Sequence, residues 1–122
     1  MDVEVDPHSP EPASVPVRRR VIALVGSGEL APGTRLPTVR SLAEQLGLAA
    51  NTVAKAYREL EAAGVVETRG RHGTFVAASD DARERAADEA AQDYVRRTRT
   101  LGLDEGDAVA RVRRAWAAGH PA

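Results

Sequence analysis

Apolar residues recur at helical spacing in three successive segments of the first half of the chain. Positions three and four residues apart share one face of a helix, so each segment predicts an amphipathic helix. We expect the first over about 16–27, the second from Thr38 to Gly47 and the third from about Asn51 to Gly64. The three apolar stripes are Val17, Val21, Leu24 and Val25; Val39, Leu42, Ala43 and Leu46; and Val53, Ala56, Tyr57 and Leu60.

Beyond Gly64 the pattern shortens to that of strands. Segments 65–69 and 74–78 are β-branched or apolar and flank Gly-Arg-His-Gly at 70–73, which predicts a β-hairpin with a basic tip. From Asp80 the chain is rich in Ala, Arg and acidic residues. This composition predicts a helix of about twenty residues, followed by a shorter one from about Glu105 to Ala118.

These elements together predict a mostly α fold with a small β-hairpin. Two helices joined by a tight turn, with a supporting helix before them and a basic hairpin after them, are typical of a winged helix-turn-helix. We place this domain over 15–78 and two C-terminal dimerisation helices over 79–122. Residues 1–14 hold three prolines and several acids, so we expect a flexible acidic tail there.

Composition narrows the range of chemistry. The 122 residues include no Cys and only three scattered His, which argues against disulfides, thiol nucleophiles and clustered zinc ligands. We expect no metal site, no cofactor and no enzymatic activity, because no catalytic constellation or phosphate-binding loop is apparent. No apolar run approaches the ~20 residues of a membrane span, and the acidic start is unlike a secretory signal. The expected location is cytoplasmic, without a membrane partner.

Charge is distributed unevenly along the chain. The formal net charge is −1, but residues 1–15 carry four acids and no base, whereas residues 16–78 carry nine bases and five acids. The remaining segment, 79–122, holds eight Arg and nine acids. The surplus of positive charge therefore lies in the predicted winged domain, where it could meet a polyanion or be an ordinary solvated face.

The third predicted helix has two distinct faces. On a helical wheel its apolar stripe lies almost opposite Asn51, Lys55 and Arg58. Lys or Arg can donate to guanine and Asn can pair with adenine, so this polar face suits the major groove of DNA. An ordinary surface helix, or a winged helix that contacts proteins without DNA sequence specificity, remains the alternative.

Four motifs in this region resemble the DNA-binding domain of the GntR family of bacterial transcription regulators. They are a Gly-x-Leu-x-Pro-Gly turn, Leu-Pro-x-x-Arg-x-Leu-Ala, Asn-Thr-Val and Gly-Thr-x-Val, found within 28–48, 51–70 and 72–76. The chain departs from the family in having Ala49 and Ala50 where Ser-Arg is common, so a frequent base-reading arginine is missing. The short C-terminal part resembles the YtrA-type branch, whose two C-terminal helices form a dimer.

The resemblance implies a role for particular residues. Thr38 and Arg40 would meet the phosphate backbone, and Asn51, Thr52 and Lys55 would lie in or beside the major groove. Tyr57 and Arg58 could reach phosphates, although the wheel puts the Tyr57 ring on the core side with its hydroxyl exposed. The hairpin would approach the minor groove with Arg69, Arg71, His72 and Gly73, where His72 is equally well explained as an exposed residue without a special role.

The two C-terminal helices carry thin apolar stripes that so small a chain has little core to cover. We therefore expect a homodimer. The expected dimerisation residues are Ala87, Ala91, Tyr94, Val95, Leu101, Val109, Val112 and Trp116. In the alternative, both helices fold back on their own winged domain. The predicted function is a sequence-specific transcriptional repressor that binds a palindromic operator in double-stranded DNA, with any small-molecule effector left unknown.

Overall fold

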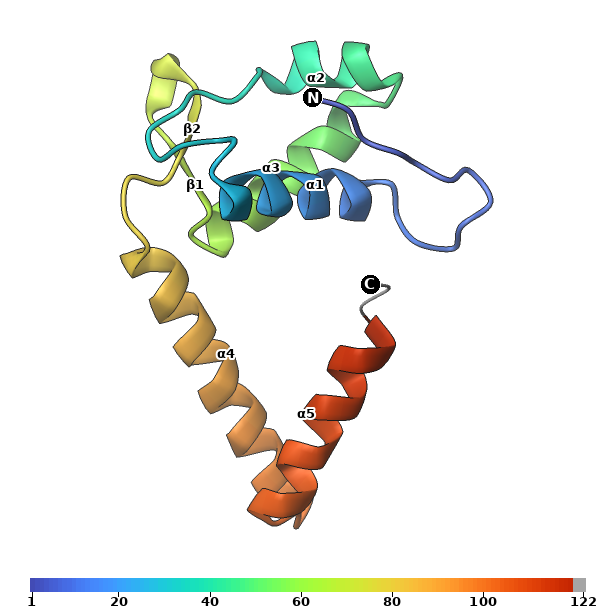
Figure 1. Ribbon diagram of the computed structural model, residues 1–122, viewed down its shortest axis with the longest axis vertical. Coiled ribbons are helices and arrows are strands. Elements are labelled where there is room, and N and C mark those ends of the chain that lie inside the picture. The colour runs from blue at the N-terminus through green and yellow to red at the C-terminus, as the bar shows by residue number, and fades with distance from the viewer. Residues whose placement is uncertain (120–122) are drawn as a thin grey trace. The chain divides into compact units, whose positions relative to one another are not determined.

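The computed structural model describes residues 1–119 and, in that range, contains five α-helices, a 3-10 helix and a two-stranded antiparallel sheet (Figure 1). The elements are α1 (Ser14–Ser27), α2 (Val39–Leu46), α3 (Ala50–Ala62), β1 (Val66–Thr68), η1 (Gly70–His72), β2 (Thr74–Val76), α4 (Asp81–Thr100) and α5 (Glu105–Gly119). The predicted fold class, mostly α with a small hairpin, is confirmed. The chain divides into two compact units, Met1–Ala86 and Ala87–Ala122.

The helix-turn-helix forms where the sequence places its caps. The hydroxyl oxygen of Thr38 accepts a hydrogen bond from the backbone N–H of Ser41 at 3.0 Å and so begins α2. Gly47 ends α2 with a φ of 66°, in the left-handed region that glycine adopts without a steric penalty. The turn to α3 is correspondingly short, with Ala49 as the residue that precedes α3.

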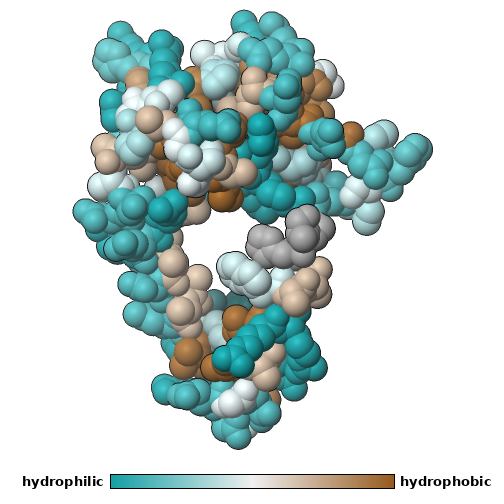
Figure 2. Space-filling model, viewed as in Figure 1, coloured by the Kyte–Doolittle hydropathy of each residue, from teal (hydrophilic) through white to brown (hydrophobic). Residues whose placement is uncertain are grey.

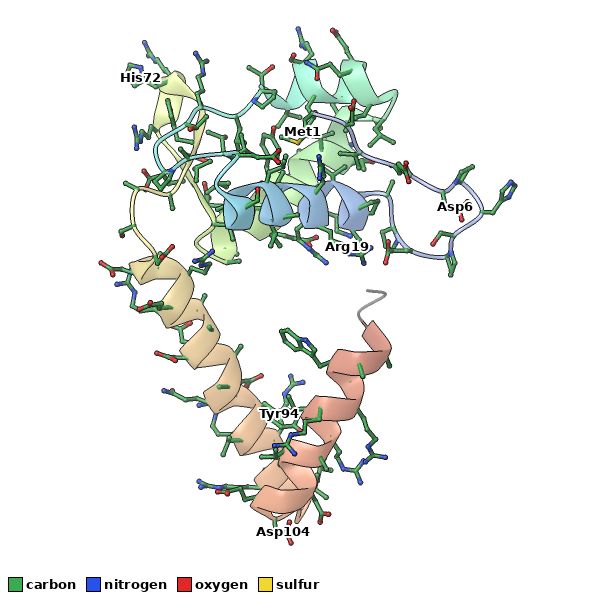
Figure 3. The ribbon with its side chains drawn as sticks, viewed as in Figure 1. Met1, Asp6, Arg19, His72, Tyr94 and Asp104 are labelled. Carbon is green, nitrogen blue, oxygen red and sulfur yellow. The ribbon has the colours of Figure 1, made fainter. Side chains whose placement is uncertain are left out.

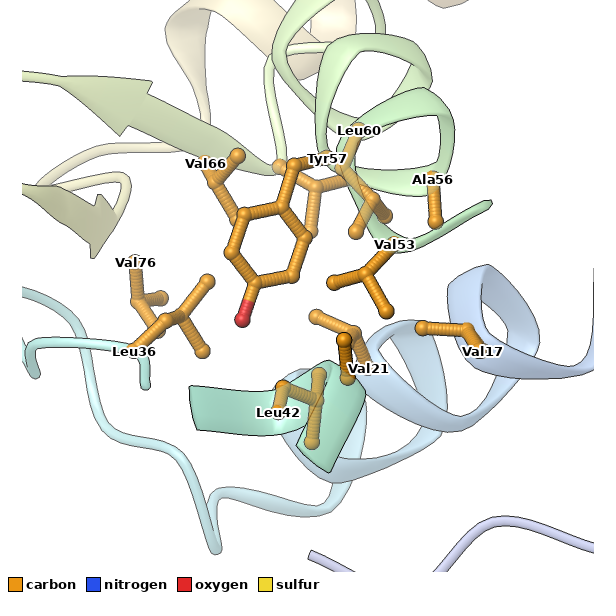
Figure 4. Packing of buried hydrophobic residues seen from close by; sticks show 12 residues of the cluster. Val17, Val21, Leu36, Leu42, Val53, Ala56, Tyr57, Leu60, Val66 and Val76 are labelled. Carbon is orange, nitrogen blue, oxygen red and sulfur yellow. The ribbon is translucent and has the colours of Figure 1, made fainter. Parts of the chain in front are cut away.

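The first unit has its own core at the meeting point of its three helices and the hairpin. Figure 4 shows the side chains converging from α1, α2, α3 and both strands. Val17, Val21, Leu42, Val53 and Leu60 are completely buried there. The wider cluster adds Leu36, Ala43, Ala56, Tyr57, Val65, Val66 and Val76. The three apolar stripes of the sequence therefore meet in one core, which fixes the direction of the opposite face of α3.

The hairpin is short and is widened by the segment before α2. Val66 faces Val76, Glu67 faces Phe75 and Thr68 faces Thr74 across the two strands. On the other side of β2, Arg35 faces Phe75 in an isolated antiparallel bridge. The sequence predicted strands of five residues, but three residues pair in each: β1 ends before the chain turns into η1 at Gly70, and β2 ends at Val76.

The N-terminal segment before α1 belongs to the first unit and packs on its core. Met1 and Val3 are half-buried and pack against its core, and the carboxylate of Glu11 pairs with Arg19 at 2.9 Å. Helix α1 begins at Ser14, two residues earlier than the apolar stripe indicates. Met1 and Val3 therefore face the core, while the acidic residues that alternate with them, Asp2 and Glu4, are exposed.

The second unit is built from most of α4 together with α5. The Tyr94 hydroxyl of α4 donates to the Ala108 carbonyl of α5 at 2.7 Å, and Figure 3 shows Tyr94 between the two helices. Asp104 caps α5 by accepting a hydrogen bond from the N–H of Asp107 at 2.9 Å. The side chain of Thr98 turns back onto α4 and donates to the Tyr94 carbonyl at 2.9 Å.

The division between the two units falls inside α4, after Ala86, whereas the sequence pattern placed the domain boundary at 78/79. A Cβ added to Gly64 would lie 2.5 Å from the backbone nitrogen of Arg83, so the first turn of α4 packs closely on the turn after α3. Residues up to Ala86 consequently belong to the first unit. The end of the predicted C-terminal segment, 120–122, lies outside the described residues. Within residues 1–119, no helix is long and apolar enough to cross a membrane.

Candidate nucleic-acid interface

The outward face of α3 is polar, as the helical wheel predicts. Asn51, Lys55 and Arg58 are exposed, while Val53, Ala56 and Leu60 on the opposite face are completely buried. Thr52 is half-buried at the margin between the two faces. The helix therefore offers amide and cationic donors to solvent, while its apolar stripe fixes its rotation against the domain.

A carboxylate on α3 is neutralised by a neighbouring helix. Glu59 forms an ion pair and hydrogen bond with Arg18 of α1, and both side chains are about one-third exposed. The pair joins the two helices on the flank of the core. It also reduces the negative charge beside the polar face of α3, which favours the approach of an anionic backbone.

The start of α2 offers a second group of donors. Thr38 and Arg40 are exposed, and Arg40 is the second residue of the helix. The Thr38 oxygen already accepts the N–H of Ser41, which leaves its hydroxyl proton able to donate. A hydroxyl, a guanidinium and the N-terminal end of a helix dipole are all suited to a phosphate oxygen.

Tyr57 is buried, whereas the implied contact with a phosphate would require its hydroxyl to be exposed. The whole residue retains 5% of its surface, and its hydroxyl donates to the Pro37 carbonyl at 2.7 Å. Burial raises the pKa of Tyr57 to about 12, so the hydroxyl keeps its proton at neutral pH. Because Pro37 immediately precedes Thr38, the contact ties α3 to the start of α2.

The tip of the hairpin carries two exposed basic side chains. Arg71 and His72 lie on η1, and Figure 3 shows His72 at the end of the hairpin. Gly73 follows with a φ of 106°, which is a conformation that strongly favours glycine. The short η1 turn and the positive φ of Gly73 form the tip, on which Arg71 and His72 are exposed.

Arg69 differs from the other basic residues of the hairpin because its guanidinium already contacts other side chains. Its guanidinium pairs with the Glu67 carboxylate at 2.7 Å and lies 4.4 Å from the centre of the Phe75 ring. The sequence motifs grouped Arg69 with the tip, but they do not identify these two partners. Arg35, which the sequence analysis did not include, lies on the same side of the hairpin, opposite Phe75 and four residues before the start of α2. Its place directly before the apolar Leu36 and the Pro37–Thr38 start of α2 was the available signal in the sequence.

The expected dimerisation residues lie on α4 and α5 and are largely exposed. The side chains of Leu101 and Trp116 retain 75% and 69% of their surface, and Val95, Val109 and Val112 are between 40% and 44% exposed. Ala87 and Ala91 are exposed and Tyr94 is half-buried. Together with Ala90 and Ala108, several of these side chains line an apolar groove between the helices, and Figure 2 shows hydrophobic atoms on the surface of this helix pair.

Comparison with known proteins identifies the family. Residues 14–76 match the family described as bacterial regulatory proteins, gntR family. The chain is 53% identical over 107 residues to the HTH-type transcriptional regulator Rv1152 of Mycobacterium tuberculosis, with 88% of each chain covered.

Solved structures show the same arrangement of elements. YtrA from Sulfolobus acidocaldarius, a GntR-family transcription factor, is 26% identical, with a TM-score of 0.62 over 94% of this chain and 97% of that one. The DNA-binding domain of AraR in complex with operator ORX1 is 27% identical, with a TM-score of 0.56 over 63% of this chain and 99% of that one. The chain belongs to the gntR family of bacterial regulatory proteins and is a DNA-binding transcriptional regulator.

Proposed function

We propose that the protein binds a palindromic operator as a homodimer and represses transcription from it. The observation that best supports this is the outward face of α3, where Asn51, Lys55 and Arg58 are exposed opposite a fully packed core. Such a helix can enter the major groove without exposing its apolar stripe. Bound to its operator, the dimer would exclude the transcription machinery, and it would do so in the cytoplasm, where the chromosome lies.

Each element of the winged domain has a distinct role in this proposal. Thr38 and Arg40 at the start of α2, together with Arg58 of α3, hold phosphates and set the register. Asn51, Thr52 and Lys55 read base edges from α3. The hairpin tip approaches the minor groove through Arg71, His72 and Gly73. Arg69 stabilises the hairpin through its contacts with Glu67 and Phe75.

The α4–α5 pair supplies the dimer contact. Two copies that bring their apolar grooves together would cover side chains such as Val109, Val112 and Trp116, which one copy leaves exposed. The two α3 helices would then face half-sites about one helical turn, ~34 Å, apart.

A winged helix that contacts only proteins is less consistent with this surface. A protein-binding face would be expected to gather exposed apolar residues at its centre. The outward face of α3 instead carries an amide and two cations, and the family consists of DNA-binding regulators.

The test begins with selection of duplexes from a random-sequence library by the intact protein. We expect the selected sequences to share a palindrome, the protein to scatter light as a dimer, and transcription from a promoter carrying the palindrome to fall when protein is added. Selected sequences without two-fold symmetry would contradict the proposed homodimer on a palindrome. Increased transcription would contradict the proposed repression but not the proposed dimer on a palindrome.

Two variants then separate phosphate contacts from base contacts. Arg40→Ala should weaken binding to all duplexes and lower the salt slope by about one per protomer, since one phosphate contact is lost. Lys55→Ala should also relax discrimination at one base pair by about 1–3 kcal/mol. Equal losses on the selected and on scrambled duplexes for both variants would contradict this division of roles.

A further inference from the structure

Arg35 lies on the extended segment before α2, which pairs with β2 through an isolated antiparallel bridge. The N–H of Leu36 donates to the Thr74 carbonyl at 2.8 Å, and the N–H of Val76 donates to the Thr34 carbonyl at 2.8 Å. Between these two hydrogen bonds, Arg35 stands opposite Phe75, which itself stands opposite Glu67 of β1.

This register decides the direction of the Arg35 side chain. Residues that face each other in an antiparallel sheet point to the same side, and neighbours along a strand point to opposite sides. Leu36, Val66 and Val76 are buried in the core, so the row formed by Arg35, Phe75 and Glu67 occupies the outer side. Arg35 is exposed there.

Gly73 provides the space in which the Arg35 guanidinium lies. A Cβ added at Gly73 would come 3.1 Å from Nε of Arg35 and 3.4 Å from its terminal Nη2 atom. The guanidinium therefore rests directly over the glycine that follows the tip residues Arg71 and His72. An arginine held in this way has less freedom to lose when it binds a ligand than one on a free loop.

The charges on this side of the hairpin are not equivalent. Arg69 is paired with Glu67 at 2.7 Å and stacked on Phe75, so its guanidinium already has a carboxylate partner in the free protein. No hydrogen bond or ion pair is formed by the Arg35 side chain among residues 1–119. Arg35 therefore retains its full set of guanidinium donors next to the tip.

We infer that Arg35 is a further DNA-contacting residue, which binds a backbone phosphate beside the groove that the hairpin tip approaches. The inference rests on the proposed DNA-binding face and adds a contact to it. The planar guanidinium matches the geometry of a phosphate, and its position over Gly73 keeps it next to the hairpin tip. Arg69 is then a positioning residue, which stiffens the hairpin through Glu67 and Phe75.

The decisive measurement is the salt dependence of DNA affinity. Arg35→Gln keeps most of the side-chain length over Gly73 but removes the charge, and the probe is the labelled duplex that the wild-type protein selects from a random library. We expect affinity to fall about tenfold per protomer, as for loss of one charge-assisted contact in each half-site. The slope of log affinity against log salt should decrease by about 0.9 per protomer.

Control variants distinguish a phosphate contact from general effects. Arg20 is exposed on α1 and forms no ion pair within residues 1–119, so Arg20→Gln removes an equal charge elsewhere and should leave affinity and slope nearly unchanged. Arg35→Lys should retain the slope. Arg69→Gln should lower affinity through a less rigid hairpin but leave the slope unchanged.

An unchanged slope in Arg35→Gln, or an equal decrease in Arg20→Gln, overturns the inference while leaving DNA binding by the wild type intact. If Arg35→Gln does not fold, the Nε–H resonance of Arg35 in the wild-type protein gives the answer. This resonance, identified by its absence in Arg35→Lys, should shift on addition of the duplex, and an unmoved resonance overturns the inference. Failure of the wild type to bind any duplex would overturn the proposed function itself.

Discussion

The two units of the chain differ in how far their apolar residues are buried. The first unit gathers twelve residues from three helices and a hairpin into one buried cluster. In the second unit, among residues 87–119, Thr98 alone is buried, while Leu101 and Trp116 remain mostly exposed. A helix pair of this length gains little stability without a covering surface. We therefore expect the winged domain to fold by itself and the helix pair to gain stability from a covering partner.

The most severe test separates the two units. Truncation after Ala86 should leave a folded, monomeric winged domain, because all members of its core cluster are retained. It should bind the selected palindrome about 10²–10⁴-fold more weakly than the intact protein, since two linked half-site contacts become one. Light scattering, thermal denaturation and fluorescence anisotropy measure the three properties.

A second truncation, after Ser79, is the matched control. It also removes the first turn of α4, which packs on Gly64, so it should melt at a lower temperature than the longer fragment. A fragment ending at Ala86 that is still dimeric would place the dimer interface in the winged domain. An intact protein that is monomeric and binds its palindrome with full affinity would favour helices that fold back on their own domain.

Paired substitutions compare a buried and an exposed side chain. Leu60→Ala should lower the free energy of unfolding by about 2–5 kcal/mol, because Leu60 is completely buried in α3. Trp116→Ala should instead weaken the dimer by about 2 kcal/mol or more, as expected for an aromatic anchor at an interface. Urea denaturation and sedimentation equilibrium distinguish these outcomes. The comparison fails if Trp116→Ala destabilises the winged domain as strongly as Leu60→Ala does.

A glycine pair tests the packing where the first unit receives α4. Gly64 and Gly28 both have a positive φ, at 75° and 84°, but only Gly64 has backbone atoms within 3 Å of an added Cβ. Gly28→Ala should cost about 1 kcal/mol for its backbone conformation. Gly64→Ala should cost about 2–4 kcal/mol, because a steric clash with Ala82 and Arg83 is added. Similar melting temperatures for the two variants would contradict this packing.

The sequence was most informative where local chemistry decides the structure. Thr38 and Gly47 cap the two ends of α2, as expected. The helical period also correctly separates the buried side of α3 from Lys55 and Arg58. Both features depend on residues that lie close together along the chain, and capping and amphipathicity act over that range.

Contacts between distant segments escaped prediction. Tyr57 finds the Pro37 carbonyl, and Arg35 lies over Gly73, because tertiary packing brings these residues together. The guanidinium of Arg69 pairs with Glu67 and lies over the Phe75 ring. Both contacts depend on the hairpin conformation, so a sequence motif could not show that Arg69 already has partners. The periodic pattern likewise could not place the domain boundary within α4, because Gly64 meets that helix through a long-range contact.

The smallest expected effect concerns Tyr57, which links the core of the first unit to the proposed DNA-binding surface. Tyr57→Phe removes the hydrogen bond to the Pro37 carbonyl and should lower the free energy of unfolding by about 1 kcal/mol. In the folded protein, burial raises the pKa of Tyr57 to about 12, whereas the unfolded residue ionises near its ordinary value of 10.0. The unfolded state therefore loses its proton first, and this residue's contribution to stability, fully present below about pH 10, is lost as the pH rises toward 12.

Urea denaturation of both proteins across this alkaline range measures the effect, and the stability difference between wild type and Tyr57→Phe should shrink as the pH rises. Salt titration of DNA binding at neutral pH supplies the second half of the test. Because the hydroxyl is directed to Pro37 and the residue is 5% exposed, the variant should keep the wild-type salt slope. A change in slope would indicate that Tyr57 takes part in backbone binding after all, and that the division between supporting core and contacting surface is wrong at this position.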